Sequence, residues 1–564
     1  MSGLESTILS VFSYLMPVMA LIVLVRCVRS MLRGKQDTEI WGYIHTDDGV
    51  LIINHWENIL GRSRTADIPL PYPTVSRVHA VLMRGNRGWH LHDIFSKGGV
   101  WVNGERVGIS GTAVHDGDIL NLAGNSIRFR DISLQQRDAI DARRKRKWKK
   151  VHPAITLLDL TLFQVLLVLE HLISAEKDAL PGIALGFALL ILFEWFCYFA
   201  MRSIRRTGFE VETLAFFLSS LGLSIIATSV PGEMLRQIIL MIVGVALFFF
   251  VGWWLRDLER TKTMRLPVAV IALALLAVNV ILGETRYGAE NWLSIGGVSV
   301  QPSELVKVAY IYVGAATLDH LFRTRNLIVF IGFSAICVIC MALIGDFGAA
   351  LIFFLTFLVI SFMRSGSIAT VALAVTGAGL AGFLVMTVKP HVAQRFSSWG
   401  HVWEDVYNNG YQQARAMSAA ASGGLFGKGA GAGWLKEDFA ANTDTVFAVM
   451  CEELGLIVAI CAVLAIISLC FFVVRNAAQG RSAYYSIAAC ATASMFMIQM
   501  ALNVFGSVDI LPFTGVTFPF VSRGGTSLLS CWMLLAFIKA SDTRKGASFV
   551  VKPPAAIDRK ESAS

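Results

Sequence analysis

The chain has 564 residues, of which 55% are hydrophobic and 16% charged, and its mean hydropathy is +0.61. These values exclude an ordinary soluble globular protein and predict an integral membrane protein. The net charge of +9 does not indicate a nucleic-acid partner, because the basic residues cluster beside apolar segments, as between Arg143 and Lys150. Such clusters are typical of the cytoplasmic ends of membrane helices.

The first apolar segment, near residues 7–25, lacks a small-residue cleavage site and is followed by Arg26, Arg29 and Arg33. We therefore expect residues 1–35 to form a retained membrane anchor rather than a signal peptide. The nine cysteines lie in or at the ends of apolar segments, without metal-ligand spacing to histidines. This placement favours neither a disulfide framework nor a zinc site.

Windows of about 17 to 22 apolar residues predict a polytopic protein with about thirteen transmembrane helices. The positive-inside rule places the N-terminus outside, and the segment after the first helix and the C-terminus in the cytoplasm. In this orientation residues 283–302, 390–442 and 506–523 lie outside, where they can form one external site. The predicted helices lie near residues 7–25, 154–173, 182–201, 211–230, 237–255, 266–283, 303–320, 327–345, 349–363, 368–387, 445–474, 484–505 and 524–539.

A different periodicity appears between the first helix and the basic run, at residues 38–133. Short segments with alternating apolar residues are separated there by turn signals such as Asn103-Gly104 and Asp116-Gly117. This spacing predicts a cytoplasmic all-β sandwich. The clearest strand candidates are Gly49 to Asn54, His79 to Met83, Trp89 to His92 and Ser126 to Phe129.

The predicted sandwich contains the motifs Gly61-Arg62, Ser76-Arg77-Val78-His79 and Val102-Asn103-Gly104. Together they resemble the forkhead-associated (FHA) domain, which binds phosphothreonine. The resemblance implies that Arg62, Ser76 and Arg77 bind the phosphate and that His79 supports the loops. A guanidinium fork and a hydroxyl group suit a doubly charged phosphate.

One departure from the FHA pattern concerns the target peptide. Gly98-Gly99-Val100 stands where that family usually has Asn-Gly-Thr, so an expected contact with the peptide backbone is lost. The alternative interpretation is that Arg62 and Arg77 are solvated charges on a scaffold that no longer binds phosphothreonine.

Ionisable residues also lie beside or inside the apolar helices, at Glu304, Lys307, Asp346 and Glu452-Glu453. Charges at such depth are costly and usually mark function. Glu304 and Lys307 are three residues apart on one predicted helix, so they share a face and can pair. The alternative is a structural ion pair that holds two helices together.

Four further stretches occur in order along residues 210–540, namely Trp292 to Lys307, Gly345 to Gly348, Trp403 to Gly455 and Asn503 to Ser527. Together they resemble the SEDS (shape, elongation, division and sporulation) family of RodA/FtsW-like peptidoglycan polymerases. The resemblance implies a core of about ten helices. The chain departs from the family pattern at Val406, where the family often has proline, and at Gly345, which replaces a proline.

These patterns together predict the domain organisation. An N-terminal membrane anchor (1–35) is followed by the FHA domain (38–133), a basic linker (134–152), and two extra transmembrane helices without an assigned role (153–206). The SEDS polymerase core (207–542) contains a long polar external loop (388–443), and a cytoplasmic tail (543–564) follows. A loop of that length in a membrane protein usually binds or reacts with something.

The SEDS resemblance implies glycosyl transfer between lipid-linked disaccharides (lipid II), in which a sugar hydroxyl of the acceptor displaces the lipid diphosphate of the donor with inversion. Asp405 occupies the position of the family's catalytic carboxylate, and we assign it the role of general base. Arg395 and Lys428 are candidate diphosphate ligands. Further candidates are Glu304, Lys307 and Gln412 for substrate binding, and Asp346 and Glu452 as structural or functional intramembrane residues.

No cofactor follows from the sequence with certainty, although a divalent cation that neutralises the diphosphate is chemically reasonable. The resemblances imply three partners, namely lipid II, a class B penicillin-binding protein (transpeptidase) and a phosphothreonine-containing cytoplasmic protein. Two other function classes stay open. A flippase or transporter of lipid-linked sugars would also use intramembrane charges, and a membrane-anchored phosphothreonine scaffold would use the FHA domain alone.

Overall fold

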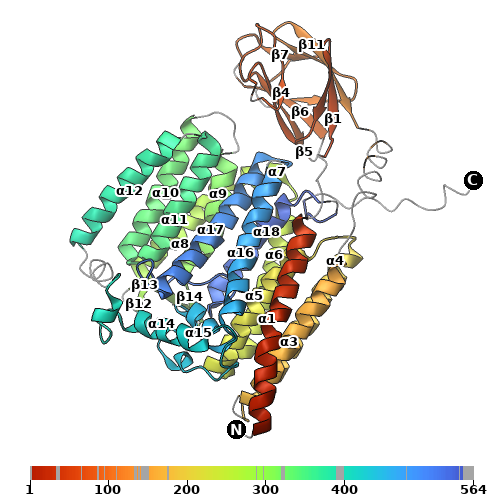
Figure 1. The fold of residues 1–564 in the computed structure, drawn as a ribbon. Coiled ribbons are helices and arrows are strands. Elements are labelled where there is room, and N and C mark those ends of the chain that lie inside the picture. The colour runs from red at the N-terminus through yellow and green to blue at the C-terminus, as the bar shows by residue number, and fades with distance from the viewer. Residues whose placement is uncertain are drawn as a thin grey trace, which may run out of the picture.

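The computed structural model shows a bundle of long helices with a β-sandwich at one end (Figure 1). The chain starts at the opposite end of the bundle, and the sandwich and the last helix's C-terminal end lie together. The structure describes residues 3–32, 39–64, 66–85, 88–94, 96–108, 111–132, 136, 140, 152–174, 177–286, 289–295, 298–318, 324–366, 368–388, 399–477, 479–544 and 546–550.

The protein is membrane-integral, and each predicted span overlaps a helix. Within the described residues, nine helices are long and apolar enough to cross a membrane. These are α1 (Gly3–Leu32), α3 (Pro153–Ser174), α4 (Leu180–Ser203), α5 (Glu210–Ser229), α6 (Met234–Trp254), α8 (Arg265–Leu282), α10 (Thr324–Ile344), α16 (Leu456–Ala477) and α17 (Ala483–Ser507). The remaining predicted spans correspond to α9 (Pro302–Leu318), α11 (Phe347–Ser365), α12 (Ile368–Val388) and α18 (Gly525–Ser541).

One predicted span, residues 445–474, is divided in the structure. A short helix, α15 (Val446–Glu453), ends before Gly455, and α16 begins directly after it. Gly455 has φ +88°, and a Cβ atom there would lie 2.4 Å from the carbonyl carbon of Phe426. The close approach of this distant segment therefore separates two helices that the apolar sequence presents as one.

Helix α5 lies at the centre of the bundle, with 94% of its membrane window buried. Buried ion pairs tie its first turn to the segment at the end of α18. Arg544 Nη1 lies 3.0 Å from Glu210 Oε2, and Lys539 Nζ lies 2.9 Å from Glu212 Oε1. Such pairs satisfy charges that would be costly if left alone in an apolar interior.

The β-sandwich consists of two sheets around an apolar core that includes Leu60, Leu82, Leu91, Leu120 and Phe129. All four strand candidates are confirmed. One sheet has the order β2 (Gly49–Ile53), β1 (Gly42–Thr46), β11 (Asn125–Asp131), β10 (Ile119–Leu122), β7 (Val100–Val102), β8 (Glu105–Arg106). The other has the order β4 (Ile68–Pro69), β3 (Glu57–Gly61), β5 (Ala80–Gly85), β6 (Gly88–Asp93), β9 (Thr112–Val114).

The sandwich is in direct contact with the helical bundle. The carboxylate of Glu57 pairs with Lys262 of the short helix α7 (Leu258–Thr263) and accepts a hydrogen bond from Ser482 Oγ at 3.0 Å. The backbone N–H of Trp56 donates to the carbonyl oxygen of Arg481 at 2.6 Å. The Arg481 guanidinium in turn contacts both carboxylate oxygens of Glu39, at 2.7 and 2.9 Å.

The opposite end of the bundle carries the predicted external segments. A small sheet of β12 (Glu284–Arg286), β13 (Ala289–Ile295) and β14 (Val298–Val300) precedes α9. The 3-10 helix η1 (Pro231–Glu233) lies earlier in the chain, between α5 and α6. The 3-10 helices η2 (Val402–Glu404) and η3 (Leu435–Glu437) and the helix α14 (Tyr411–Gly423) lie further along. Figure 1 shows β12, β13, α14 and α15 grouped at the end remote from the sandwich.

Candidate catalytic site

Two of the three predicted external segments contact one another. Two hydrogen bonds join the segment at residues 390–442 to the segment at residues 506–523. Arg523 N donates to Asn442 O at 2.8 Å, and Gln413 Nε2 donates to Gly506 O at 2.8 Å. The first external segment contacts the start of α18 through Gln301, whose N–H donates to Thr526 Oγ1 at 3.3 Å. These contacts thus join the second and third predicted segments to each other, whereas the first contacts the helix that follows the third.

Asp405 follows η2 and is half-buried. Its Oδ1 accepts a hydrogen bond from Asn408 Nδ2 at 2.7 Å, and its Oδ2 accepts from Asn409 N at 3.2 Å. The turn depends on Gly410, because a Cβ atom there would lie 2.6 Å from Val402 O. These two hydrogen bonds orient the carboxylate, which stays partly open to solvent.

Lys428 lies in a glycine-rich segment, defined here as residues 423–435, that folds around the buried carboxylate of Glu452. Lys428 Nζ contacts Glu452 Oε1 at 2.9 Å. The same carboxylate accepts from Trp434 N at 3.2 Å and Leu435 N at 3.0 Å. Glu452 belongs to α15, which is not one of the nine described helices that are long and apolar enough to cross a membrane. Its carboxylate binds three groups of the glycine-rich segment and so holds that segment, including Lys428, in place.

Other residues of the external loop are held by local partners. Gln412 Nε2 donates to Phe439 O at 3.4 Å. Arg415 pairs with Asp438, and its guanidinium lies 4.5 Å from the ring centroid of Trp434. The prediction for Arg395 lies outside the described residues.

The intramembrane candidates have defined contacts as well. Lys307 Nζ lies 2.7 Å from Glu304 Oε1, both side chains are buried, and Ser530 Oγ of α18 donates to Glu304 Oε2 at 3.0 Å. The helical spacing thus pairs Glu304 with Lys307 as predicted. Asp346 caps the N-terminus of α11, where it accepts from Ala349 N at 2.9 Å and from Asn291 Nδ2 at 3.1 Å. None of these contacts involves Asp405.

Asn503 is a residue of the site that sequence reasoning did not single out. Its Nδ2 donates to Asp444 O at 2.9 Å and to Val516 O at 2.8 Å, so it joins the end of the external loop to the segment before α18. In the sequence, Asn503 is the first residue of the fourth stretch that resembles the SEDS family. That position alone does not indicate what its side chain does.

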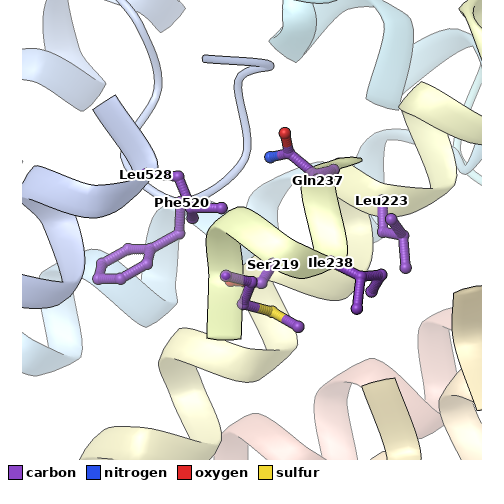
Figure 2. A pocket seen from close by; sticks show the side chains of 7 residues that line it. Ser219, Leu223, Gln237, Ile238, Phe520 and Leu528 are labelled. Carbon is purple, nitrogen blue, oxygen red and sulfur yellow. The ribbon is translucent and has the colours of Figure 1, made fainter. Parts of the chain in front are cut away.

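Figure 2 shows a cavity between α5, α6 and the start of α18, lined by Ser219, Gln237 and Phe520 among others. Its volume is about 10 Å³. This space suits one water molecule and is far too small for a saccharide. We therefore do not assign the substrate to this cavity.

The described residues contain no group of three or more His, Cys, Asp or Glu side chains placed to hold a metal ion. Asp405 would need ligands from the substrate to bind a cation.

The predicted phosphate ligands gather at the end of the sandwich remote from the bundle. Arg62 N donates to Ser76 O at 2.9 Å, and Ser63 N donates to Arg77 O at 3.1 Å, which fixes the two loops side by side. The side chains of Arg62 and Arg77 are exposed. Gly61 permits this approach, because a Cβ atom there would lie 2.3 Å from Arg77 O.

His79 and Gly98 shape the loops beside the predicted phosphate ligands. His79 is buried and holds the loops, since its Nδ1 accepts from Ser76 N at 3.0 Å and its Nε2 lies 2.9 Å from Gly99 O. This is the structural role expected for it. Gly98 packs so closely that a Cβ atom would lie 2.2 Å from the Cβ of Ala123, so this backbone arrangement leaves no room for the asparagine of the usual pattern.

Comparison with known proteins agrees with this geometry. Residues 212–545 match the "Cell cycle protein" family model of FtsW, RodA and SpoVE, and residues 58–123 match the FHA domain. Stage V sporulation protein E of Bacillus subtilis is 32% identical over 52% of this chain and 82% of its own length. Peptidoglycan glycosyltransferase RodA of Mycobacterium tuberculosis is 29% identical over 54% of this chain and 69% of its own length.

A solved structure of a peptidoglycan synthase complex contains a chain with the same fold, at a TM-score of 0.51 and 22% identity, covering 59% of this chain and 96% of that one. The protein therefore combines a polytopic helical membrane core with a β-sandwich domain. The chain belongs to the FtsW/RodA/SpoVE (SEDS) family and carries an FHA domain.

Proposed function

We propose that this protein is a peptidoglycan glycosyltransferase that polymerises lipid II at the outer face of the cytoplasmic membrane. Its family membership and its relatives, named as peptidoglycan glycosyltransferases, support this activity. The observation that carries the proposal is Asp405, a half-buried carboxylate oriented by Asn408 and Asn409 on the surface where the external segments meet.

In this reaction Asp405 accepts the proton of the acceptor's sugar hydroxyl as the oxygen attacks the anomeric carbon of the donor. The bond from that carbon to the lipid diphosphate breaks with inversion, and the diphosphate departs as a stable anion. A general acid is therefore unnecessary. Lys428 supplies a cation for the developing negative charge, although it must exchange part of its contact with Glu452 to do so.

The proposed topology places the N-terminus and the external segments outside, and the FHA domain and the C-terminus in the cytoplasm. Basic loops support this orientation through the positive-inside rule. The arrangement of the bundle is compatible with it, because the FHA domain and α14, which follows Asp405 in the external loop, lie at opposite ends (Figure 1). A cytoplasmic FHA domain would meet proteins phosphorylated by ATP-dependent kinases.

We further propose two protein partners. A class B penicillin-binding protein would crosslink the strands that this protein makes, which agrees with the fold shared with a peptidoglycan synthase complex that couples polymerization and crosslinking. A phosphothreonine-containing protein would bind Arg62, Ser76 and Arg77 and adjust wall synthesis.

Purified full-length protein, with and without a co-expressed class B penicillin-binding protein, should convert lipid II into glycan polymers that are resolved by gel electrophoresis. Polymer in either preparation supports the proposal. Movement of lipid II across a vesicle membrane without polymer would instead favour the flippase alternative. Neither polymer nor movement, with intact phosphopeptide binding, would favour the scaffold.

A further inference from the structure

In the part of the chain that the structure describes, α1, α3 and α4 lie before the residues that match the family model, which begin at 212. Two of them, α1 and α3, pack against each other, and both reach the external end of the bundle, where the glycine-rich segment lies (Figure 1). Helix α3 contacts that segment through hydrogen bonds, and α1 contacts it through an aromatic pair.

Helix α3 contributes two polar side chains from its last turn. Glu170, which is 1% exposed, accepts a hydrogen bond at its Oε2 from Ala430 N at 3.3 Å. Ser174 donates through its hydroxyl group to Ala430 O. Both backbone polar groups of one residue are thus bound by one helix, which fixes the position and the orientation of the peptide at Ala430.

The approach of α3 also restricts the next residue. Gly431 has φ +83°, and a Cβ atom there would lie 3.1 Å from Ser174 Oγ and 3.5 Å from Thr228 Cγ2. A larger residue would be strained at this φ and would crowd the Ser174 hydroxyl group. The backbone therefore fits closely against this helix.

Helix α1 contacts the same segment on the other side of Lys428. The rings of Tyr14 and Phe426 pack edge to face with their centroids 4.7 Å apart. Such an aromatic pair contributes beyond the area that it buries. The segment is consequently held before Lys428 by α1 and after it by α3.

Lys428 itself is held between these two contacts. Its N–H donates to Glu452 O at 2.9 Å, and the next N–H, of Gly429, donates to Glu453 O at 3.0 Å. These bonds fix the segment to α15, and the contacts at Phe426 and Ala430 fix its two flanks to helices outside the family core. A displacement of either flank would move the ammonium group of Lys428.

We infer that α1 and α3 form a positioning element for the glycine-rich segment, in which Glu170 and Ser174 are positioning residues that hold Lys428 toward the diphosphate of lipid II. This inference rests on the proposed function and assigns a role to helices that the family model does not include. None of these residues touches the reacting atoms.

The test compares Glu170→Ala, Glu170→Gln and Asp159→Ala in the full-length protein. The glutamine carboxamide oxygen can still accept from Ala430 N, whereas alanine cannot. Asp159 is the matched control, because it ties the same two helices at their other ends through Arg26, with Arg26 Nη1 at 2.6 Å from Asp159 Oδ2. The readouts are kcat and KM for lipid II, the thermal midpoint, and deuterium uptake of residues 425–435.

We expect Glu170→Ala to lower kcat/KM by about tenfold, because small misplacements of a binding group are costly, and to raise deuterium uptake of residues 425–435. Glu170→Gln and Asp159→Ala should stay near wild type in both readouts. Equal loss of activity in Glu170→Ala and Asp159→Ala would overturn the inference, because general helix packing would explain it. Unchanged uptake in Glu170→Ala would also overturn it.

The outcome is distinguishable from failure of the proposed function. If the wild-type protein makes no polymer, the glycosyltransferase proposal fails. Deuterium uptake still decides in that case whether Glu170 holds the glycine-rich segment.

Discussion

Glu57 and Arg62 lie at opposite ends of β3, with Glu57 as the first residue of the strand and Arg62 directly after its last. Glu57 contacts the helical bundle through Lys262 and Ser482, whereas Arg62 belongs to the predicted phosphate site. Because an extended chain rises about 3.3 Å per residue, the two sites are roughly 17 Å apart. The predicted phosphate site is therefore separate from the contact with the bundle, and we expect a phosphopeptide to bind there without breaking the Glu57 contacts.

Phosphothreonine binding is expected to depend on Arg62. Arg62→Ala should weaken binding of a phosphothreonine peptide by roughly 10- to 100-fold, since a hydrogen bond to a charged group contributes about 1.5–3 kcal/mol. Fluorescence anisotropy with the full-length protein measures this change. Arg128→Ala, which removes an exposed arginine from β11, should leave the affinity unchanged. Equal binding of phosphorylated and unphosphorylated peptides would reject the phosphothreonine assignment.

The contact between the FHA domain and the bundle is expected to depend on Glu57 and Lys262. Their side chains are 6% and 12% exposed, and removal of one partner of such a pair costs about 3–5 kcal/mol. Hydrogen exchange at the Trp56 amide reports this directly, because that N–H donates to Arg481 O. Glu57→Gln and Lys262→Met should each speed the exchange.

A double-mutant cycle separates direct pairing from a general disturbance. The combined Glu57→Gln and Lys262→Met variant should show a coupling energy of about 1–3 kcal/mol. The control pair is Arg130 and Asp116, 3.3 Å apart on the exposed surface of the sandwich, where we expect a coupling near zero. Additive effects in the Glu57 cycle would show that the pair does not hold the domain.

His92 makes the stability of the FHA domain depend on pH. Burial lowers its pKa from the ordinary value of 6.5, and the positive charges of His90 and Lys262 add to this effect while Glu259 opposes it. The unfolded chain therefore takes up the proton first. The stabilisation is complete above pH 6.5 and is lost as the pH falls through the lowered pKa.

Thermal unfolding of the full-length protein from about pH 7.5 to about pH 5.5 tests this linkage. The midpoint of the wild-type protein should fall more on acidification than that of His92→Gln, which cannot titrate at this position. Identical pH profiles would show that protonation of His92 is not coupled to folding.

The sequence was most informative where structure follows from local periodicity. Alternating residues located four strands of the FHA domain, β2, β5, β6 and β11, and the spacing of Glu304 and Lys307 predicted their ion pair. Local patterns say nothing about contacts between distant segments. Glu39 and Arg481 are 442 positions apart, and Glu170 and Ala430 are 260 apart, so neither contact could be inferred.

The division of one predicted helix has the same origin. The apolar residues before and after Gly455 fit a single span, and only the approach of Phe426 shows why the helix must stop. The place of Asp405 could be predicted from its motif, but its orientation could not, because that depends on the turn that brings Asn408 and Asn409 to its carboxylate.

Asp405 is expected to be indispensable for polymerisation. Asp405→Asn keeps the size of the side chain but cannot accept the substrate proton, and loss of a general base typically costs about 10²–10⁴-fold in rate. Lipid II binding should persist, because the substrate contacts remain. The matched control is Glu404→Gln, an exposed neighbour on η2, which should polymerise at a rate close to that of the wild type. Gel analysis of the glycan products gives the rates, and binding to immobilised lipid II gives the affinities. Wild-type polymerisation by Asp405→Asn, or an equal loss in Glu404→Gln, would remove Asp405 from the role of base.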